Sequence, residues 1–301
     1  MKRGLTFVLL MSLSLFACAE HLFEIGLHGG VSGWNTRPVY VEKRIGFHGG
    51  VQIGYTYISP YVIGLHTGLT LDNQHAGFDK ANYEDSYSTT DVDNQQMKIA
   101  YTIGQLSEQS SMWSVGIPMQ LAFSRENISF FVGPKVVFPF ANSWRQTVDS
   151  TILTVYYPDF DNTVTQSYPL ATHRGKFSQK GQLALPKTQW WLSMELNYSI
   201  PLYSKPMQYR SYLIIGAYFD YCLTKTTTSI GSRKSLMMLS DTRDGFPLER
   251  IFTPIVEAQR PGRKLIGTCN LFDVGIKLSY AIAPHTARHR STYPCRCQKY
   301  N

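Results

Sequence analysis

The sequence predicts an all-β fold, an eight-stranded antiparallel transmembrane β-barrel with long extracellular loops. Three features indicate this fold: alternating apolar and polar residues, an export signal, and connections that alternate between short and long. The alternation is clearest in residues 47–71, FHGGVQIGYTYISPYVIGLHTGLTL. Because side chains alternate across a strand, this stretch forms a hairpin with one apolar face and one polar, Gly-rich face. Each arm can cross a bilayer as a tilted strand of roughly 9–11 residues.

The N-terminal segment 1–19 has the pattern of an export signal. Lys2 and Arg3 precede an apolar run over residues 5–16, and Ala17-Cys18-Ala19 fits a cleavage site after residue 19. The apolar run is too short for a transmembrane helix. An alternative reading of the same residues is a lipobox with Cys18 as the lipidated residue.

Eight segments alternate as strands do, and they form one barrel domain over residues 20–282. They cover residues 22–32, 45–57, 61–72, 112–123, 128–140, 189–200, 210–224 and 270–282. Short connections alternate with long ones, as in bacterial barrels with short periplasmic turns and long outer loops. Both termini are therefore expected in the periplasm. A soluble sandwich would also have short alternating strands, but it would not predict this alternation of loop lengths.

Aromatic residues cluster at both ends of the expected strands, as the two girdles of a membrane barrel do. The inner girdle is expected to contain Tyr55, Tyr57, Tyr61, Phe123, Tyr198 and Tyr280, and the outer girdle Trp113, Phe138, Phe140 and Trp190.

The net charge of +8 is unevenly distributed. The tail at residues 283–301 is basic, and we expect it to be a disordered periplasmic segment. An exported protein rarely meets nucleic acid, so the expected counter-charges are lipopolysaccharide and anionic lipid headgroups of an outer membrane.

Several segments resemble the outer-membrane β-barrel domain of Bacteroidota, the porin family or PorT-like group. The resembling segments are FEIGLHGGVSGWN, GFHGGVQIGYTYISPYVIGLHTGLTL and SVGIPMQLAF followed by FFVGPKVVFPF. The resemblance implies an eight-stranded barrel without an assigned role in most members, and one relative takes part in protein secretion. This chain departs from the pattern because a basic tail follows the last strand.

An eight-stranded barrel has an interior just wide enough for side chains to fill it. Charged residues on the inward parity should therefore be paired. We expect Lys135 to pair with Glu195 on neighbouring strands, and Glu24 to pair with Lys277 where the first and last strands meet. These pairs would make a polar plug, and a water-filled pore is the alternative.

Three histidines on the inward parity raise the question of a metal site. Pairing around Ser59-Pro60 is expected to join residues whose numbers sum to about 118, so that His66 faces Gln52. His28 and His48 could meet, but two histidines alone are a poor metal cage. We therefore expect no metal, no cofactor, and lumenal hydrogen bonding by the histidines.

The mature chain has four cysteines. Cys222 and Cys269 share the inward parity at the outer ends of strands seven and eight, so a disulfide there is one expectation and free thiols are the other. Cys295 and Cys297 lie in the tail, where the spacing would strain an intrachain bridge.

Two outer loops carry opposite charge. Residues 73–111 have a net charge of −4, and residues 225–269 have a net charge of +4. A protein partner is one expectation, bound through the two loops 73–111 and 225–269. The second loop also holds the apolar stretches 236–239 and 252–256, which predict either such a partner or a loop folded over the barrel mouth. A solvated loop is the third interpretation.

No catalytic motif is present: the sequence lacks G-x-S-x-G, H-E-x-x-H and a phosphate-binding loop. We therefore expect a non-enzymatic surface binding or assembly protein with a plugged lumen, with an accessory role in protein secretion as one form of that function. The alternatives are a narrow porin for small solutes and an outer-membrane enzyme with a site at the rim.

Overall fold

The computed structural model confirms the predicted fold class. It describes most of the chain between residues 20 and 284. The described residues are 20–38, 41–59, 63–90, 94–149, 151–160, 162–166, 177–202, 209–224, 236–239, 250–260, 263–264 and 266–284. The export signal at 1–19 with Cys18, Tyr61, and the tail from residue 285 with Cys295 and Cys297 lie outside them.

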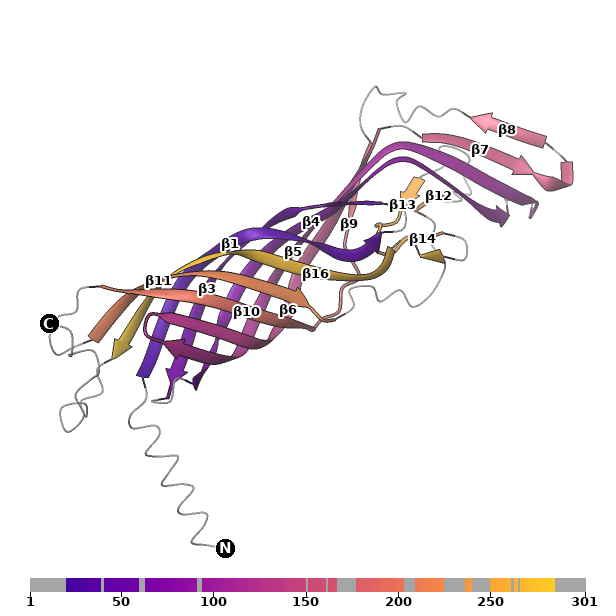
Figure 1. Cartoon of the computed structure of the whole chain (residues 1–301). Helices are drawn as coiled ribbons and strands as arrows, with labels where there is room; N and C mark the ends of the chain where they lie inside the picture. Colours follow the sequence, from indigo (N-terminus) through magenta and orange to yellow (C-terminus); the bar gives the residue numbers. More distant parts are fainter. Residues whose placement is uncertain are drawn as a thin grey trace, which may run out of the picture.

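Eight antiparallel strands close into a ring (Figure 1). The ring strands are β1 (Glu20–Pro38), β3 (Gly46–Ile58), β4 (Ile63–Thr90), β5 (Gln96–Arg125), β6 (Ile128–Val148), β10 (Gln189–Pro201), β11 (Tyr209–Cys222) and β16 (Ile266–Pro284). Their order around the ring is β4-β3-β1-β16-β11-β10-β6-β5, and pairing of β5 with β4 closes it. Each predicted strand is present, and β16 continues two residues past the predicted domain boundary.

The alternation of the sequence separates an apolar exterior from a polar lumen. On β16, the outward Ile276 is 73% exposed, whereas the neighbouring inward Lys277 is 2% exposed. The same contrast holds on β3 between Phe47 and His48. This pattern places the charged residues of the barrel inside and leaves large apolar side chains on its outer surface. Among the described residues, no helix is long and apolar enough to cross a membrane.

Residues 73–111 were expected to be a loop, but residues 73–90 continue β4 and residues 96–111 continue β5, and the two pair beyond the barrel (Figure 1). Short strands add to this extension: β2 (Glu42–Arg44), β7 (Thr151–Tyr157), β8 (Asn162–Gln166) and β9 (Phe177–Gly181), with the 3-10 helix η1 (Pro158–Phe160) between β7 and β8. We call the sheet formed by β4 residues 80–90, β5 residues 96–106, β7 and β8 the platform. The prediction of a loop was wrong here because apolar and polar residues keep alternating beyond the length that a strand needs to cross a membrane.

The extension has an apolar core of its own. Its fully buried side chains include Phe78, Ile99, Ile103, Leu106 and Val148. The fourth outer loop contributes to this core through Leu236, Ile255 and Val256. This loop also holds β12 (Met237–Leu239), β13 (Arg250–Phe252), β14 (Gln259–Arg260) and β15 (Arg263–Lys264). The described residues of the stretch 252–256, namely 253–256, are buried, so the interpretation of a solvated loop is wrong for them.

The β3–β4 hairpin has a different register from the expected one. Its paired residues sum to 122, so Gln52 faces Thr70 and His66 faces Thr56. The centre of the connection therefore lies at residue 61 instead of residue 59. The start of the first barrel strand and the end of the last one are neighbours, because Phe23 of β1 pairs with Ile282 of β16. The platform extends from the opposite end of the barrel (Figure 1).

Candidate functional site in the barrel lumen

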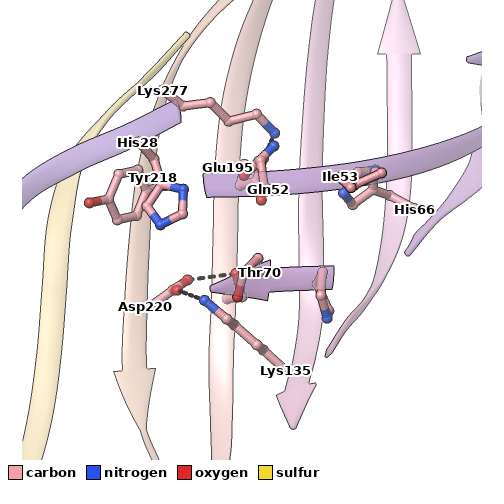
Figure 2. A pocket seen from close by; sticks show the side chains of 13 residues that line it. His28, Gln52, Ile53, His66, Thr70, Lys135, Glu195, Tyr218, Asp220 and Lys277 are labelled. Atoms are coloured by element: carbon pink, nitrogen blue, oxygen red, sulfur yellow. Dashed lines mark hydrogen bonds and ion pairs between the residues drawn. The ribbon is translucent and has the colours of Figure 1, made fainter. Parts of the chain in front are cut away.

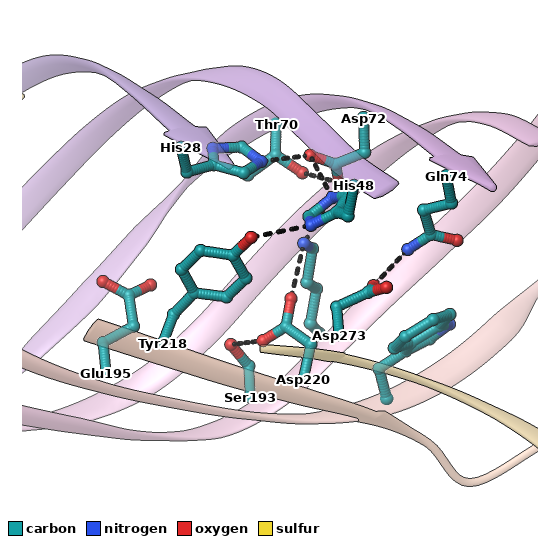
Figure 3. Close-up of polar contacts among 12 residues, drawn as sticks. His28, His48, Thr70, Asp72, Gln74, Ser193, Glu195, Tyr218, Asp220 and Asp273 are labelled. Atoms are coloured by element: carbon teal, nitrogen blue, oxygen red, sulfur yellow. Dashed lines mark hydrogen bonds and ion pairs between the residues drawn. The ribbon is translucent and has the colours of Figure 1, made fainter. Parts of the chain in front are cut away.

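Two ion-pair networks fill the barrel lumen. The aspartate network, on the platform side, joins Lys135 to Asp72 and Asp220. The glutamate network, on the side of the termini, joins Lys277 to Glu24 and Glu195. Figure 2 labels Lys277 and Glu195 of the glutamate network, and Figure 3 labels Asp72 and Asp220 of the aspartate network. Together the two networks connect strands from all around the ring.

The aspartate network centres on the ammonium of Lys135. Its Nζ donates to Asp72 Oδ2 at 3.1 Å and to Asp220 Oδ2 at 2.9 Å. Asp220 also accepts a hydrogen bond from Ser193 Oγ at 2.6 Å. Asp273 faces Asp220 across β11 and β16 and accepts from the Gln74 amide. These carboxylates come from β4, β11 and β16, so the lysine of β6 bridges the lumen.

Of the two predicted ion pairs, one is present in the glutamate network and the other is absent. Lys277 Nζ donates to Glu24 Oε1 at 3.1 Å, as expected, and also to Glu195 Oε2 at 2.5 Å. The expected pair of Lys135 and Glu195 is absent. In the β6–β10 register Glu195 faces Phe131 and Lys135 faces Trp191, so the two charges are four residues apart along the strands.

A second cluster combines the two histidines and the aspartate of adjacent strands. His28 Nε2 is 2.7 Å from Asp72 Oδ1, and His48 Nε2 is 3.7 Å from the same oxygen. His48 Nδ1 lies 2.8 Å from the hydroxyl of Tyr218 (Figure 3). His66 does not join them, since its Nδ1 bonds to Thr56 Oγ1 at 2.7 Å. Sequence reasoning missed Asp72 because the assumed hairpin register placed it away from His28.

The space left between the two networks is small. A cavity of about 20 Å³ lies among His28, Gln52, His66, Lys135 and Tyr218 (Figure 2). This volume is on the scale of one water molecule. The described part of the lumen therefore has no room for a solute at this level.

At the platform side, the fourth loop closes over the lumen and packs against the strands that extend beyond the barrel. We call residues 253–258 the mouth segment. The backbone N–H of Ile255 donates to Glu108 Oε2 at 2.7 Å, and Gln146 Nε2 donates both to this oxygen, at 2.5 Å, and to the Thr253 carbonyl, at 2.9 Å. Burial raises the pKa of the Glu108 carboxyl from 4.5 to about 7. Glu108 is thus a titratable contact of the mouth segment.

Both cysteine thiols of the barrel are free and buried. The expected disulfide is absent, because Tyr221 faces Phe272 and the next residue, Cys222, therefore faces Leu271. Cys269 is its diagonal neighbour. Diagonal side chains in a sheet are about 7 Å apart, whereas a disulfide needs a Cβ–Cβ distance of about 3.8 Å.

The predicted girdle residues that the structure describes lie on the outer surface of the barrel. Toward the termini these are Tyr55, Tyr57, Phe123, Tyr198 and Tyr280, and toward the platform they are Trp113, Phe138, Phe140 and Trp190. Phe123 stacks on Phe130 of the next strand at 6.5 Å between ring centroids. Their depth in a membrane stays a prediction.

No family model matches this sequence, and no curated protein does either. Solved structures that are similar include two of Ail, the attachment invasion locus protein of Yersinia pestis, one of them in complex with the heparin analogue sucrose octasulfate. They are 10% and 9% identical to this chain, cover 89% of it and 99% of their own chains, and have a TM-score of 0.26. The fold assignment therefore rests on the strand pairing of this chain itself.

Proposed function

We propose that this protein is a non-enzymatic outer-membrane β-barrel that anchors the platform at the cell surface, where the platform binds a partner protein. The observation that carries this proposal is the platform itself. Four strands with an apolar core continue well beyond a barrel whose lumen is filled by ion pairs. A barrel that served only as a membrane plug would have no need of this extension.

The outer membrane is the compartment that fits the exterior of the barrel. A belt of exposed apolar side chains, such as Ile53, Leu196 and Ile276, covers its outer surface. Burying such a belt in hydrocarbon is favourable, and a closed barrel satisfies its backbone groups internally. Lipid and lipopolysaccharide would then contact the belt, the termini would lie in the periplasm, and the platform would face outward.

The filled lumen favours an anchor over a porin. Lys135 and Lys277 each bridge two carboxylates across the interior, and the cavity between the networks holds about 20 Å³. Breaking a buried ion pair costs several kcal/mol, so opening a path for solutes would be unfavourable. The mouth segment adds a second barrier on the platform side.

The platform offers a surface of suitable size for a partner. A shallow groove of about 480 Å³ crosses β4, β5 and β7, and Glu84, Asp85 and Ile152 line it. Ile152 is 50% exposed although it is a large apolar residue. The Glu84 carboxylate lies on the same face of the sheet as Ile152, because both residues pair with Thr102. An acidic group beside an exposed apolar side chain suits a protein partner with basic residues at its rim. A role as an accessory to protein secretion would be one use of such binding.

Photo-crosslinking in intact cells tests this proposal. A photoreactive amino acid at Ile152 should give a discrete crosslinked species, whereas the same residue at the lipid-facing Leu278 should not. Replacing Glu84 with Lys should reduce the crosslink at Ile152 without changing the amount of folded barrel in the membrane. Equal crosslinking at both positions, or none at Ile152, would count against surface binding by the platform.

A further inference from the structure

We propose that His28, His48 and Asp72 form a binding site for a first-row transition-metal dication such as Zn²⁺. Their ligand atoms lie within 4.8 Å of one another in the lumen. Imidazole nitrogens and a carboxylate oxygen are ligands that Zn²⁺ takes in proteins. The site goes beyond the proposed surface binding and does not depend on it.

The register of three adjacent strands brings the ligands together. His28 of β1 faces Gly50 of β3, and Gly50 faces Asp72 of β4. Because Gly50 has no side chain, His28 and Asp72 meet across it. A Cβ at this position would lie 2.4 Å from the Leu71 carbonyl oxygen, 2.6 Å from Asp72 Oδ1 and 2.7 Å from His28 Nε2. The glycine therefore keeps open the space in which the ligand atoms converge.

His48 presents an unused nitrogen to this space. Its side chain is 1% exposed, and Nε2 has no hydrogen-bond partner among the described residues. The other ring nitrogen, Nδ1, lies 2.8 Å from the Tyr218 hydroxyl, whose oxygen can accept a hydrogen bond from Nδ1–H. In metal sites the second nitrogen of a ligating histidine usually donates in this way, which leaves the first as a bare lone pair.

The two distances to the Asp72 carboxylate need only small adjustments to hold a metal, while the two histidine nitrogens, which lie within 4.8 Å of each other, must approach by up to about 1.5 Å. With metal–ligand bonds of about 2.0–2.2 Å, two ligand atoms on a tetrahedral ion are about 3.3 Å apart. The contact between His28 and Asp72 at 2.7 Å would lengthen by about 0.6 Å, and that between His48 and Asp72 at 3.7 Å would shorten by about 0.4 Å. The cavity that His28 lines has room for one water molecule.

Charge balance also favours a cation here. The aspartate network and its neighbour bring together three carboxylates, of Asp72, Asp220 and Asp273, against the one ammonium of Lys135. A dication would supply the two missing positive charges. Lys135 does not occupy the site, since it binds Asp72 through Oδ2 and leaves Oδ1 toward the histidines. Protons taken up by ionisable groups around the site are the other source of the two charges.

Metal analysis of the untagged, folded full chain in detergent separates these sources. The protein is treated with EDTA, dialysed, mixed with ZnCl₂, desalted and analysed for zinc by mass spectrometry. We expect about one zinc ion per chain, and with CoCl₂ the visible absorption of four-coordinate Co²⁺. His48→Gln should weaken zinc binding at least about tenfold, while His66→Gln, a lumenal histidine outside the cluster, should leave it unchanged.

Gly50→Ala provides a test that keeps all three ligands. Its methyl group would fill the space between His28 and Asp72, so zinc binding should be lost as in His48→Gln. Folding of each variant is checked by its heat-dependent mobility in gel electrophoresis. Absence of zinc from the folded wild-type protein would overturn the proposal and assign the charge balance to protons. Equal zinc in wild type and His48→Gln would also overturn it, because the bound ion would then lie elsewhere.

Discussion

Raising the pH is expected to loosen the mouth segment from the barrel through the carboxyl of Glu108. Burial raises the pKa of this carboxyl from 4.5 to about 7, and the nearby charge of Glu257 acts in the same direction. The hydrogen bonds from Gln146 and Ile255 favour the ionised form, but they do not offset the burial. Opening of the mouth segment exposes Glu108 to solvent and returns its pKa toward 4.5.

The pH range follows from these two values. Below about pH 4.5 the carboxyl is protonated whether the segment is closed or open, so the closed state keeps its full stability. Between about pH 4.5 and 7 only the closed state retains the proton, and closure becomes less favourable as the pH rises. At 1.36 kcal/mol for each pKa unit, the loss is about 3 kcal/mol above pH 7, or roughly a 300-fold larger open fraction.

Hydrogen–deuterium exchange of the amides in residues 253–258 measures this opening. After correction for the intrinsic pH dependence of exchange, protection of the Ile255 amide should fall by roughly 70-fold from pH 5 to pH 8, since part of the change is already complete at pH 5. The Glu108→Gln variant keeps an acceptor and cannot ionise, so its corrected protection should not vary with pH. A wild-type protection that is independent of pH, or a variant that changes as the wild type does, would refute this reasoning.

Two further substitutions test the packing of the lumen. Lys135→Met leaves Asp72 and Asp220 without their cation and should lower the free energy of unfolding by about 3–5 kcal/mol. The control Lys180→Met, on the exposed face of β9, should change this free energy by less than about 0.5 kcal/mol. Equal effects of the two variants in denaturant titrations of the detergent-folded protein would contradict the network. Gly30→Ala places a methyl group against the backbone of Val274 and should cost about 1–3 kcal/mol. Gly29→Ala, with its nearest contact at 3.6 Å, is the matched control in the same titration, and a similar loss in both variants would argue against the close approach of β1 and β16.

The eight strands and their inward and outward faces could be predicted because alternation is a local property of the chain. Phe47 and His48 are assigned to opposite faces by their neighbours alone, and burial agrees with that assignment. Pairing register is not local in the same way. It depends on where a connection turns, and a shift of the turn centre by two residues moves every partner by four positions.

That shift explains the first of the two main errors at the site. With the β3–β4 sum at 118, Asp72 would face Gly46, roughly 13 Å along the strand from Gly50 at about 3.3 Å per residue. The observed sum of 122 places Asp72 opposite Gly50 and beside both histidines. Lys135 and Glu195 failed to pair for a related reason, since a long loop separates their strands and gives no turn from which to count. Lys277 reaches Glu24 despite facing His28, because its long side chain spans the offset.

The most direct test of an anchor with a filled lumen is single-channel recording in planar bilayers with the purified, folded protein. The two ion-pair networks and the mouth segment predict that insertion produces no steady conductance above the baseline at pH 5 or at pH 8. Insertion itself is verified by protease protection of the barrel in lipid vesicles, so that silence is not mistaken for absence. Stable, ohmic openings of the wild-type protein would contradict the closed lumen and favour a narrow porin.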